Sequence, residues 1–433
     1  MQAQTASLIF SAAVLATLAV QFWLATRQMR HVARHRDEVP PVFRGTVSAQ
    51  AHRKAADYTL AKGRFGLLQH ALAAAVLLGW TLLGGLDALN GWLLKTALPT
   101  FGPLGYQMML VVAFAGIAAL IDLPSEWHAT FRIEQRFGFN RMTQRMWWLD
   151  HLKGAAVALV VGLPLVALVL WLMAAAGGAW WLWAWGAWVV FNLLLLVIYP
   201  TLIAPLFNRF EPLADAGLTE RVQALMRRCG FAAKGLFVMD GSRRSAHANA
   251  YFTGLGAAKR VVFYDTLLAR LEPTEVEAVL AHELGHFRHR HVVKRIVAVF
   301  TMSLLALALL GWLSSQPGFY LGLGVQPNLA APNDALALLL FMLALPPFTF
   351  FLSPLMAQVS RRHEFEADAY ACAQADGGAL ARALLKLHED NAATLTPDPV
   401  YVRFYYSHPP ASERLAALPP PSAAVSAGPS AAG

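Results

Sequence analysis

Long runs of apolar residues recur along the chain. A transmembrane helix needs about 20 consecutive apolar residues to cross the ~30 Å hydrocarbon core of a bilayer. Seven runs are long enough, and they lie at 6–25, 65–86, 104–123, 154–176, 179–200, 296–314 and 335–357. No basic residue precedes the first run, whereas a cleavable signal peptide carries its positive charge in front, so we expect this run to remain as a helix. The pattern therefore predicts a mainly α, polytopic membrane protein with seven transmembrane helices.

Composition supports a membrane protein. Of the 433 residues, 57% are hydrophobic and 14% are charged, whereas a soluble domain averages about 25% charged residues. The alternative is a soluble helical protein with very apolar core helices, and it would leave both the seven runs and the distribution of charge to accident. The two cysteines, Cys229 and Cys372, lack the spacing of a disulfide framework or a structural zinc site, and we predict no role for them.

Basic residues gather in alternate connections between the apolar runs. Nine Lys and Arg residues lie in 26–64 and five in 124–153, while the connections that alternate with them, 87–103, 177–178 and 315–334, carry Lys95 alone. Because cytoplasmic loops are the basic ones, both segments should face the cytoplasm, together with 201–295 and the chain after 358. The net charge of +9 is thus explained by basic residues in the cytoplasmic segments of a membrane protein. We expect no nucleic-acid partner, because the basic residues lack the interleaved aromatic residues of a single-strand groove.

The cytoplasmic segment after the fifth run predicts a small α+β unit. GLTERVQALMRRCGF reads as an amphipathic helix, and GLFVMDGS as a short strand. Two β-rich runs follow, joined through Gly254 and Gly256, which is typical of a β-hairpin. The next helix is expected to begin at Pro273, with Thr274 and Glu277 as a capping box.

The helix that follows carries candidate metal ligands in HELGH. His282 and His286 are one turn apart, so their imidazoles share a face and can bind one ion. Glu283, about 100° round the helix, can hold the water that the metal polarises. Two imidazoles leave a catalytic zinc one protein ligand short, so the motif needs a third ligand from elsewhere in the chain.

The third ligand is expected in SRRHEFEADAYA, which follows the last apolar run and faces the same compartment. Glu364 is the candidate ligand, and Asp368, one turn later, can accept the second N–H of a ligating histidine. The alternative is that Glu364, Glu366 and Asp368 form only the solvated face of a helix. Three further histidines are interpreted as ordinary basic residues at the membrane interface, namely His289, His291 and His363.

Several segments, in their order and spacing, resemble one family. They are LPSEWHATFRIEQRFGFNRMT, IYPTLIAPLFNRFEPL, SRRSAHANAYFTGLG, RVVFYDTLL, HELGHF, HEFEADAYA and YYSHPPASERL. They resemble the type I CaaX prenyl proteases, which are integral-membrane zinc metallopeptidases of the gluzincin group. The family pattern Glu-x-x-Ala-Asp implies that Glu364, rather than Glu366, is the third ligand. The resemblance also implies seven helices around an intramembrane chamber, with the zinc site at its cytoplasmic end.

The resemblance implies roles for residues outside the metal site. His408, in the Ser-His-Pro segment, is expected to stabilise the tetrahedral intermediate, and Arg414 is expected to bind substrate near the active site. Without the resemblance, His408 is equally well a turn residue before two prolines. Asn249, Ala250 and Tyr251 are expected to form the strand against which the substrate backbone lies. Adding a peptide to a sheet edge is a common mode of recognition on physical grounds as well.

These observations predict a membrane-embedded zinc metalloendopeptidase with one Zn²⁺ per chain. Its partners would be the lipid bilayer and a peptide or protein substrate, with or without a lipid at its C-terminus. Removal of the C-terminal tripeptide from prenylated proteins is the activity that the resemblance implies. A quality-control endopeptidase independent of prenylation is one alternative. A catalytically idle scaffold or transporter is another, although Glu283 argues against it, because a structural zinc site has no use for a general base.

The sequence also indicates the membrane in which the protein lies and the parts into which the chain divides. The Ala- and Arg-rich composition suggests a bacterial inner membrane, with the active site on the cytoplasmic side. Five parts are expected: helices 1–5 with basic loops (1–200), the metallopeptidase unit with HELGH (201–295), helices 6 and 7 (296–357), a cytoplasmic segment with HEFEAD and SHPP (358–418), and a disordered tail rich in Pro, Ala and Ser (419–433).

Overall fold

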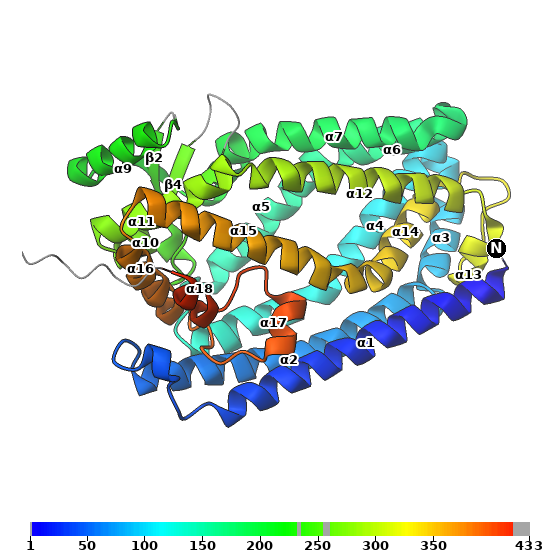
Figure 1. Cartoon of the computed structure of the whole chain (residues 1–433). Coiled ribbons are helices and arrows are strands. Elements are labelled where there is room, and N and C mark those ends of the chain that lie inside the picture. Colours follow the sequence, from blue (N-terminus) through cyan, green and yellow to red (C-terminus); the bar gives the residue numbers. More distant parts are fainter. Residues whose placement is uncertain (1, 232–234, 254–259, 419–433) are drawn as a thin grey trace, which may run out of the picture.

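The computed structural model describes residues 2–231, 235–253 and 260–418, and most of these residues form helices (Figure 1). Six helical segments among them are long and apolar enough to cross a membrane, and the bent pair of α2 and α3 makes a seventh if it counts as one span. The seven predicted runs each overlap one of these segments. The helices that build them are α1 (Ala3–Arg34), α2 (Ala49–Trp80), α3 (Gly85–Thr96), α4 (Leu98–His128), α5 (Gln144–Val157), α6 (Leu163–Ala175), α7 (Trp180–Ile198), α12 (His291–Leu313), α14 (Asp334–Thr349) and α15 (Ser353–Gln374).

Some helices are longer than the apolar runs that predicted them. α1 continues to Arg34, and α2 begins at Ala49 behind Ser48, whose side chain accepts a backbone hydrogen bond as N-cap. Most of 26–64, predicted as a connecting loop, is therefore helical, because an apolar run marks only the part of a helix that lies in hydrocarbon. α2 and α3 are bent by 44°, and between them Gly84 adopts a φ of 80°, which a side chain would make strained.

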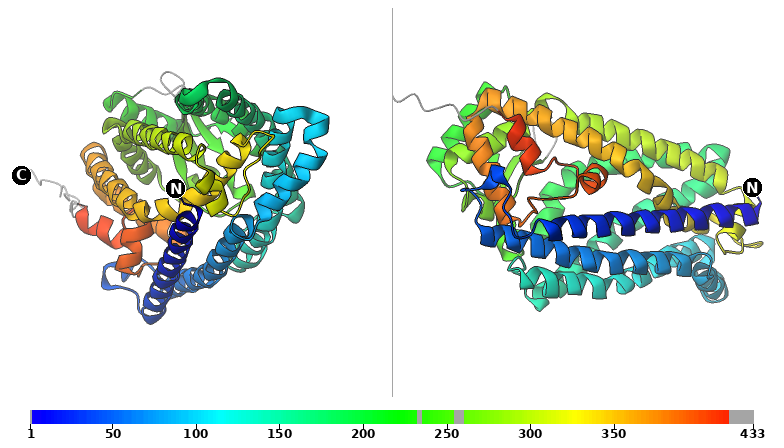
Figure 2. Two further views of the ribbon diagram at one scale, coloured as in Figure 1. Left: turned by 90° about the vertical axis from the view of Figure 1, so that its right-hand side faces the viewer. Right: turned by 60° about the horizontal axis from the view of Figure 1, so that its bottom comes forward.

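The long helices run side by side, and the small sheet lies at one end of the bundle (Figures 1 and 2). The N-terminus lies at the opposite end. A buried apolar cluster packs the helices near the N-terminus, and its members include Phe10, Leu86, Tyr106, Leu170 and Leu340. A second cluster joins the sheet to the helices around it, and its members include Leu225, Phe263, Leu280 and Leu384. The two largest apolar clusters among the described residues thus lie at opposite ends of the molecule.

The sheet has four described strands in the order β1-β2-β4-β3. They are β1 (Phe210–Pro212), β2 (Gly235–Met239), β3 (Ala250–Thr253) and β4 (Arg260–Tyr264). β2 and β4 are parallel, and the two edge strands are antiparallel to their neighbours. β3 and β4 pair as the predicted hairpin requires, with Ala250 opposite Phe263. The turn predicted at Gly254 and Gly256 lies outside the described residues. The predicted amphipathic helix is α9 (Ala216–Arg228).

The HELGH motif lies on α11 (Pro273–Arg288), which begins at Pro273 as predicted. The capping box consists of Glu272 and Glu275, so the prediction of Thr274 and Glu277 is wrong. Proline is favoured at the first helical position because it has no N–H to satisfy. This position of Pro273 makes Glu272 the N-cap.

The C-terminal segment is tied to the first helix through Asp398. Its carboxylate accepts hydrogen bonds from the N–H groups of Val400 and Tyr401 at the start of α17 (Pro399–Tyr405), and it also accepts a hydrogen bond from Arg27 Nε of α1 at 2.9 Å. Its own N–H donates to Gln28 of α1 at 2.7 Å. These contacts join the start of α17 to α1.

The remaining helices are α8 (Ala204–Phe207), α10 (Asp265–Leu268), α13 (Pro317–Gly322), α16 (Gly377–Asp390) and α18 (Ala411–Ala417).

Candidate metal centre

Two helices from distant parts of the chain, α11 and α15, lie side by side at the site (Figure 1). Their backbones come close at Gly285, where an added Cβ would lie 2.9 Å from Ala367 Cα and 3.1 Å from Ala367 O. Only glycine leaves room for the backbone of the other helix at this point. The close approach brings His282 and His286 of α11 against Glu364 of α15.

The three predicted ligands converge on one point. His282 Nε2 and His286 Nε2 are 3.3 Å apart, and each lies 3.4–3.5 Å from an oxygen of Glu364. One ligand atom from each residue lies within 4.8 Å of the other two. Glu364 Oε2 is buried and accepts no hydrogen bond from the described residues, which a bound cation would remedy. Two imidazole nitrogens and a carboxylate are the donor set of an open catalytic zinc site, so the residues fit the metal.

Glu283 follows His282 on α11, about 100° round the helix. Burial raises the pKa of its carboxyl group, and this effect outweighs the opposing charges of His282 and His286. A carboxyl group with a raised pKa can both accept and release a proton nearer to neutral pH. The arrangement therefore offers a general base next to the metal ligands.

Asp368 lies one turn after Glu364 on α15, and its carboxylate accepts a hydrogen bond from His282 Nδ1 at 2.8 Å. Arg414 of α18 donates from Nε to the other oxygen of Asp368 at 2.8 Å, and its NH1 lies 3.5 Å from Glu364 Oε2. Such an acceptor fixes the histidine tautomer with Nε2 free for a metal. Arg414 is 8% exposed, and two carboxylates of the site engage its guanidinium.

His408 lies on the connection between α17 and α18. Its Nε2 is 3.4 Å from Glu364 Oε1, and its Nδ1 is 3.0 Å from Ser407 Oγ. The side chain is 66% exposed, in contrast to buried His282 and Glu364. His408 therefore lies on the open side of the site, with one nitrogen directed at the ligands.

The predicted substrate strand is β3 and the residue before it. The carbonyl of Asn249 accepts a hydrogen bond from the N–H of Tyr264 at 3.0 Å, and Ala250 and Tyr251 pair with β4. β3 is an edge strand, and among the described residues no strand pairs with its outer side. An unpaired strand edge can bind an extended peptide through backbone hydrogen bonds.

The interpretation of His291 as an interfacial residue is wrong. His291 is 4% exposed, and its Nδ1 lies 2.9 Å from Nδ1 of the ligand candidate His286. His363 stacks on the His291 ring with centroids 3.9 Å apart, whereas His289 is exposed. Residues five positions apart do not share a helical face. The spacing therefore held no signal for the contact between His286 and His291.

Known proteins are similar to this chain over nearly its whole length. The family described as CAAX prenyl protease N-terminal, five membrane helices, matches residues 28–209, and peptidase family M48 matches residues 212–421. CAAX prenyl protease 1 of Saccharomyces cerevisiae is 30% identical over 432 residues, which are 95% of this chain and 94% of that protein. The CAAX prenyl protease 1 homolog of Homo sapiens is 32% identical over 464 residues, with 95% of each chain covered.

The crystal structure of S. mikatae Ste24p matches with a TM-score of 0.87 and 29% identity, over 96% of this chain and 99% of that chain. The predicted resemblance, the polytopic helical fold and the metallopeptidase activity are confirmed. Peptidases of family M48 depend on a metal, so the chain is a multi-pass membrane metalloendopeptidase. It belongs to the family of CAAX prenyl protease 1 homologues, whose C-terminal part is an M48 peptidase.

Proposed function

We propose that this metalloendopeptidase binds one zinc ion per chain through His282, His286 and Glu364. The observation that carries the proposal is the convergence of their ligand atoms within 4.8 Å of one another, together with Glu364 Oε2, which accepts no hydrogen bond from the described residues. The orientation of the imidazoles supports it, because both Nδ1 atoms are engaged by Asp368 and His291, which leaves both Nε2 atoms for the ion. Two imidazoles with one carboxylate favour zinc among divalent metals.

Peptide hydrolysis follows from the residues around these ligands. When bound, zinc supplies a Lewis acid that lowers the pKa of a water molecule to about 7. Glu283 accepts a proton from the attacking water and delivers it to the leaving amine nitrogen. His408 donates a hydrogen bond from Nε2 to the oxyanion that develops on the scissile carbonyl. Loss of one such donor costs about 3–4 kcal/mol of transition-state stabilisation in other enzymes.

The substrate backbone extends along the open edge of β3. Asn249, Ala250 and Tyr251 form the strand against which it lies, and Ala250, whose main-chain groups point away from β4, supplies the main-chain hydrogen bonds, as in other complexes where a peptide adds a strand to a sheet. Arg414 contributes to substrate binding indirectly, because its guanidinium holds the carboxylates of Asp368 and Glu364 in place. These contacts support a catalytic unit that joins 201–295 to 358–418.

The proposed substrate is a protein with a prenylated cysteine near its C-terminus, from which the last three residues are removed. Similarity to proteins named CAAX prenyl protease 1 over 95% of the chain supports this choice. The basic connections 26–64 and 124–153 support an active site on the cytoplasmic side of the membrane. A bacterial inner membrane is the proposed location.

A matched pair of C-terminal peptides tests the substrate. One peptide is farnesylated on its cysteine and the other is not, and detergent-purified protein is incubated with each before mass spectrometry. Glu283→Ala is the blank. We expect loss of three residues from the farnesylated peptide alone. Cleavage of both peptides at scattered positions would contradict the CaaX-type specificity and favour a general membrane endopeptidase.

A further inference from the structure

His286 has a hydrogen-bond partner of its own outside the ligand set. Its Nδ1 lies 2.9 Å from His291 Nδ1, and His291 Nε2 lies 2.9 Å from Glu366 Oε2. The His291 side chain is almost fully buried, so water does not compete for these bonds. The other ligand, His282, is held instead by a carboxylate, that of Asp368.

The two hydrogen bonds that link His286, His291 and Glu366 are compatible with one arrangement of protons on the two imidazoles. When Nε2 of His286 faces a cation, the imidazole carries its proton on Nδ1 and donates it. His291 must then accept on Nδ1, so its own proton is on Nε2 and is donated to the Glu366 carboxylate. Every donor meets an acceptor. Such a partner fixes both the tautomer and the ring orientation of a ligating histidine.

The backbone between α11 and α12 makes this contact possible. Arg290 joins the two helices with φ 56° and ψ 32°, in the left-handed region. A residue with a Cβ adopts this conformation at a cost of about 1–2 kcal/mol. On an uninterrupted helix, His291 would lie about 140° round from His286. The left-handed residue instead turns His291 back towards the metal site.

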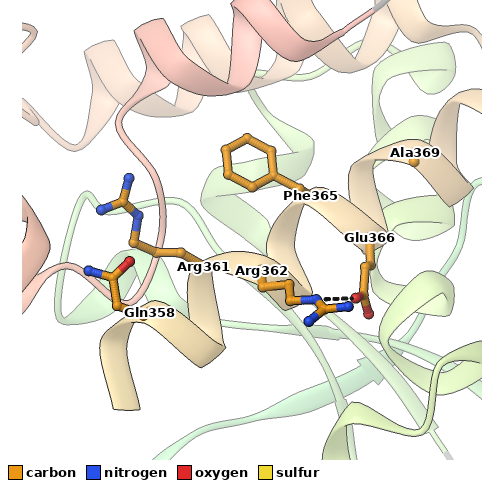
Figure 3. A pocket seen from close by; sticks show the side chains of 6 residues that line it. All are labelled: Gln358, Arg361, Arg362, Phe365, Glu366 and Ala369. Atoms are coloured by element: carbon orange, nitrogen blue, oxygen red, sulfur yellow. Dashed lines mark hydrogen bonds and ion pairs between the residues drawn. The ribbon is translucent and has the colours of Figure 1, made fainter. Parts of the chain in front are cut away.

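Glu366 and the His291 ring are each held from a second side. Arg362 lies one turn before Glu366 on α15, and its Nε is 3.1 Å from Glu366 Oε1 (Figure 3). The ring of His363 stacks on His291 with an angle of 13° between the planes. These contacts restrict the rotation of both groups, as expected of a support for a ligand.

We propose that His291 and Glu366 are positioning residues of the metal site, which hold His286 with Nε2 directed at the ion and so slow the release of zinc. This role rests on the proposed binding of zinc by His282, His286 and Glu364. Outer partners of ligating histidines change metal affinity by about 10–100-fold in other proteins. We expect an effect of this size for His291, and a smaller one for Glu366, which is one hydrogen bond farther from the ligand.

The test measures the rate at which the detergent-purified full chain releases zinc to a chromogenic chelator, together with the absorption spectrum of the Co²⁺-loaded protein. His291→Phe keeps the ring volume and the stack on His363 but cannot accept a hydrogen bond. It should release zinc about 10–100-fold faster and shift the Co²⁺ spectrum. His291→Asn places an amide oxygen near the position of Nδ1 and should restore most of the retention. His363→Phe keeps the stack and should release zinc at the wild-type rate.

Several results would overturn the proposal. They are wild-type release by His291→Phe, equal losses in His291→Phe and His291→Asn, and an equal loss in His363→Phe. If His291→Phe does not fold, Glu366→Ala is tested in its place, since Glu366 is partly exposed and its loss should be tolerated. Zinc release by Glu366→Ala at the wild-type rate would also overturn the proposal. Wild-type protein that binds no zinc would contradict the ligand set itself. That result is distinct from zinc binding that is insensitive to His291.

Discussion

Replacing Gly285 by alanine should separate α11 from α15 and weaken metal binding. The new Cβ would lie 2.9 Å from Ala367 Cα and 3.2 Å from Tyr370 Cβ. Carbon atoms pack at about 3.5–4.0 Å, so α15 would have to move away by at least about 0.6 Å. Glu364 lies one turn before Ala367 on α15 and would move with it. Ligand distances at metal sites tolerate about 0.2 Å, so the displaced carboxylate should no longer bind the ion properly.

Two effects of Gly285→Ala on the stability of the fold have opposite signs. Alanine favours a helix over glycine by about 0.8–1.0 kcal/mol, whereas overpacking of a filled site costs about 1–3 kcal/mol. The free energy of unfolding should therefore fall by at most about 2 kcal/mol, and the variant should remain folded. Zinc retention should fall much more steeply, because one of three protein ligands is displaced.

The assay combines three measurements on detergent-purified protein: zinc per chain after gel filtration, the midpoint of thermal unfolding, and peptide hydrolysis. Gly186→Ala in α7 is the matched control, because an added Cβ there meets no heavy atom within 4 Å. The control should keep its zinc and activity. A Gly285→Ala variant with wild-type zinc content and a raised unfolding midpoint would refute the reasoning.

Two further predictions concern the supports of the site. Asp368→Asn turns one acceptor into a donor and leaves buried Arg414 with Glu364 as its remaining charge partner at the site, so zinc affinity measured by chelator competition should fall about 10–100-fold; unchanged affinity would contradict this role. Asp398→Ala removes the cap of α17 and the contact with Arg27, and should lower the free energy of unfolding by about 1–2 kcal/mol, while Asp398→Asn keeps most of the cap. Burial opposes ionisation of Asp398, but hydrogen bonds from Tyr401 N–H and Arg27 outweigh it and lower the pKa. The stabilisation should therefore be complete above the usual carboxyl pKa of about 3.9 and be lost as the pH falls through the lowered value. A difference in thermal midpoint between wild type and Asp398→Ala that persisted in strong acid would contradict it.

Local patterns predicted a large part of the fold. Apolar runs located the membrane helices because crossing hydrocarbon requires an unbroken stretch of apolar residues. Strand and turn preferences predicted the β3/β4 pair, and Pro273 located the start of α11. His282, Glu283 and His286 were found together because an i, i+4 pair shares one helical face.

Contacts between distant segments could not be predicted from local patterns. Glu364 was a candidate because Asp368 lies one turn later, but the choice between Glu364 and Glu366, which lie on the same helix, came from the resemblance to a family. The approach of α15 to Gly285 and the contact of His291 with His286 depend on how two helices are placed and on one left-handed residue, Arg290. No periodicity reports such features, because they arise from tertiary packing.

The most direct test of the central claim measures zinc content and peptide hydrolysis in the same preparations of wild type, Glu283→Ala and Glu364→Ala. Wild type should hold about one zinc ion per chain and cleave its peptide. Glu283→Ala should keep the zinc and lose nearly all turnover, because the proton acceptor is gone while the ligands remain. Glu364→Ala should lose both the zinc and the turnover. Normal hydrolysis by Glu283→Ala, or full zinc content in Glu364→Ala, would contradict the account.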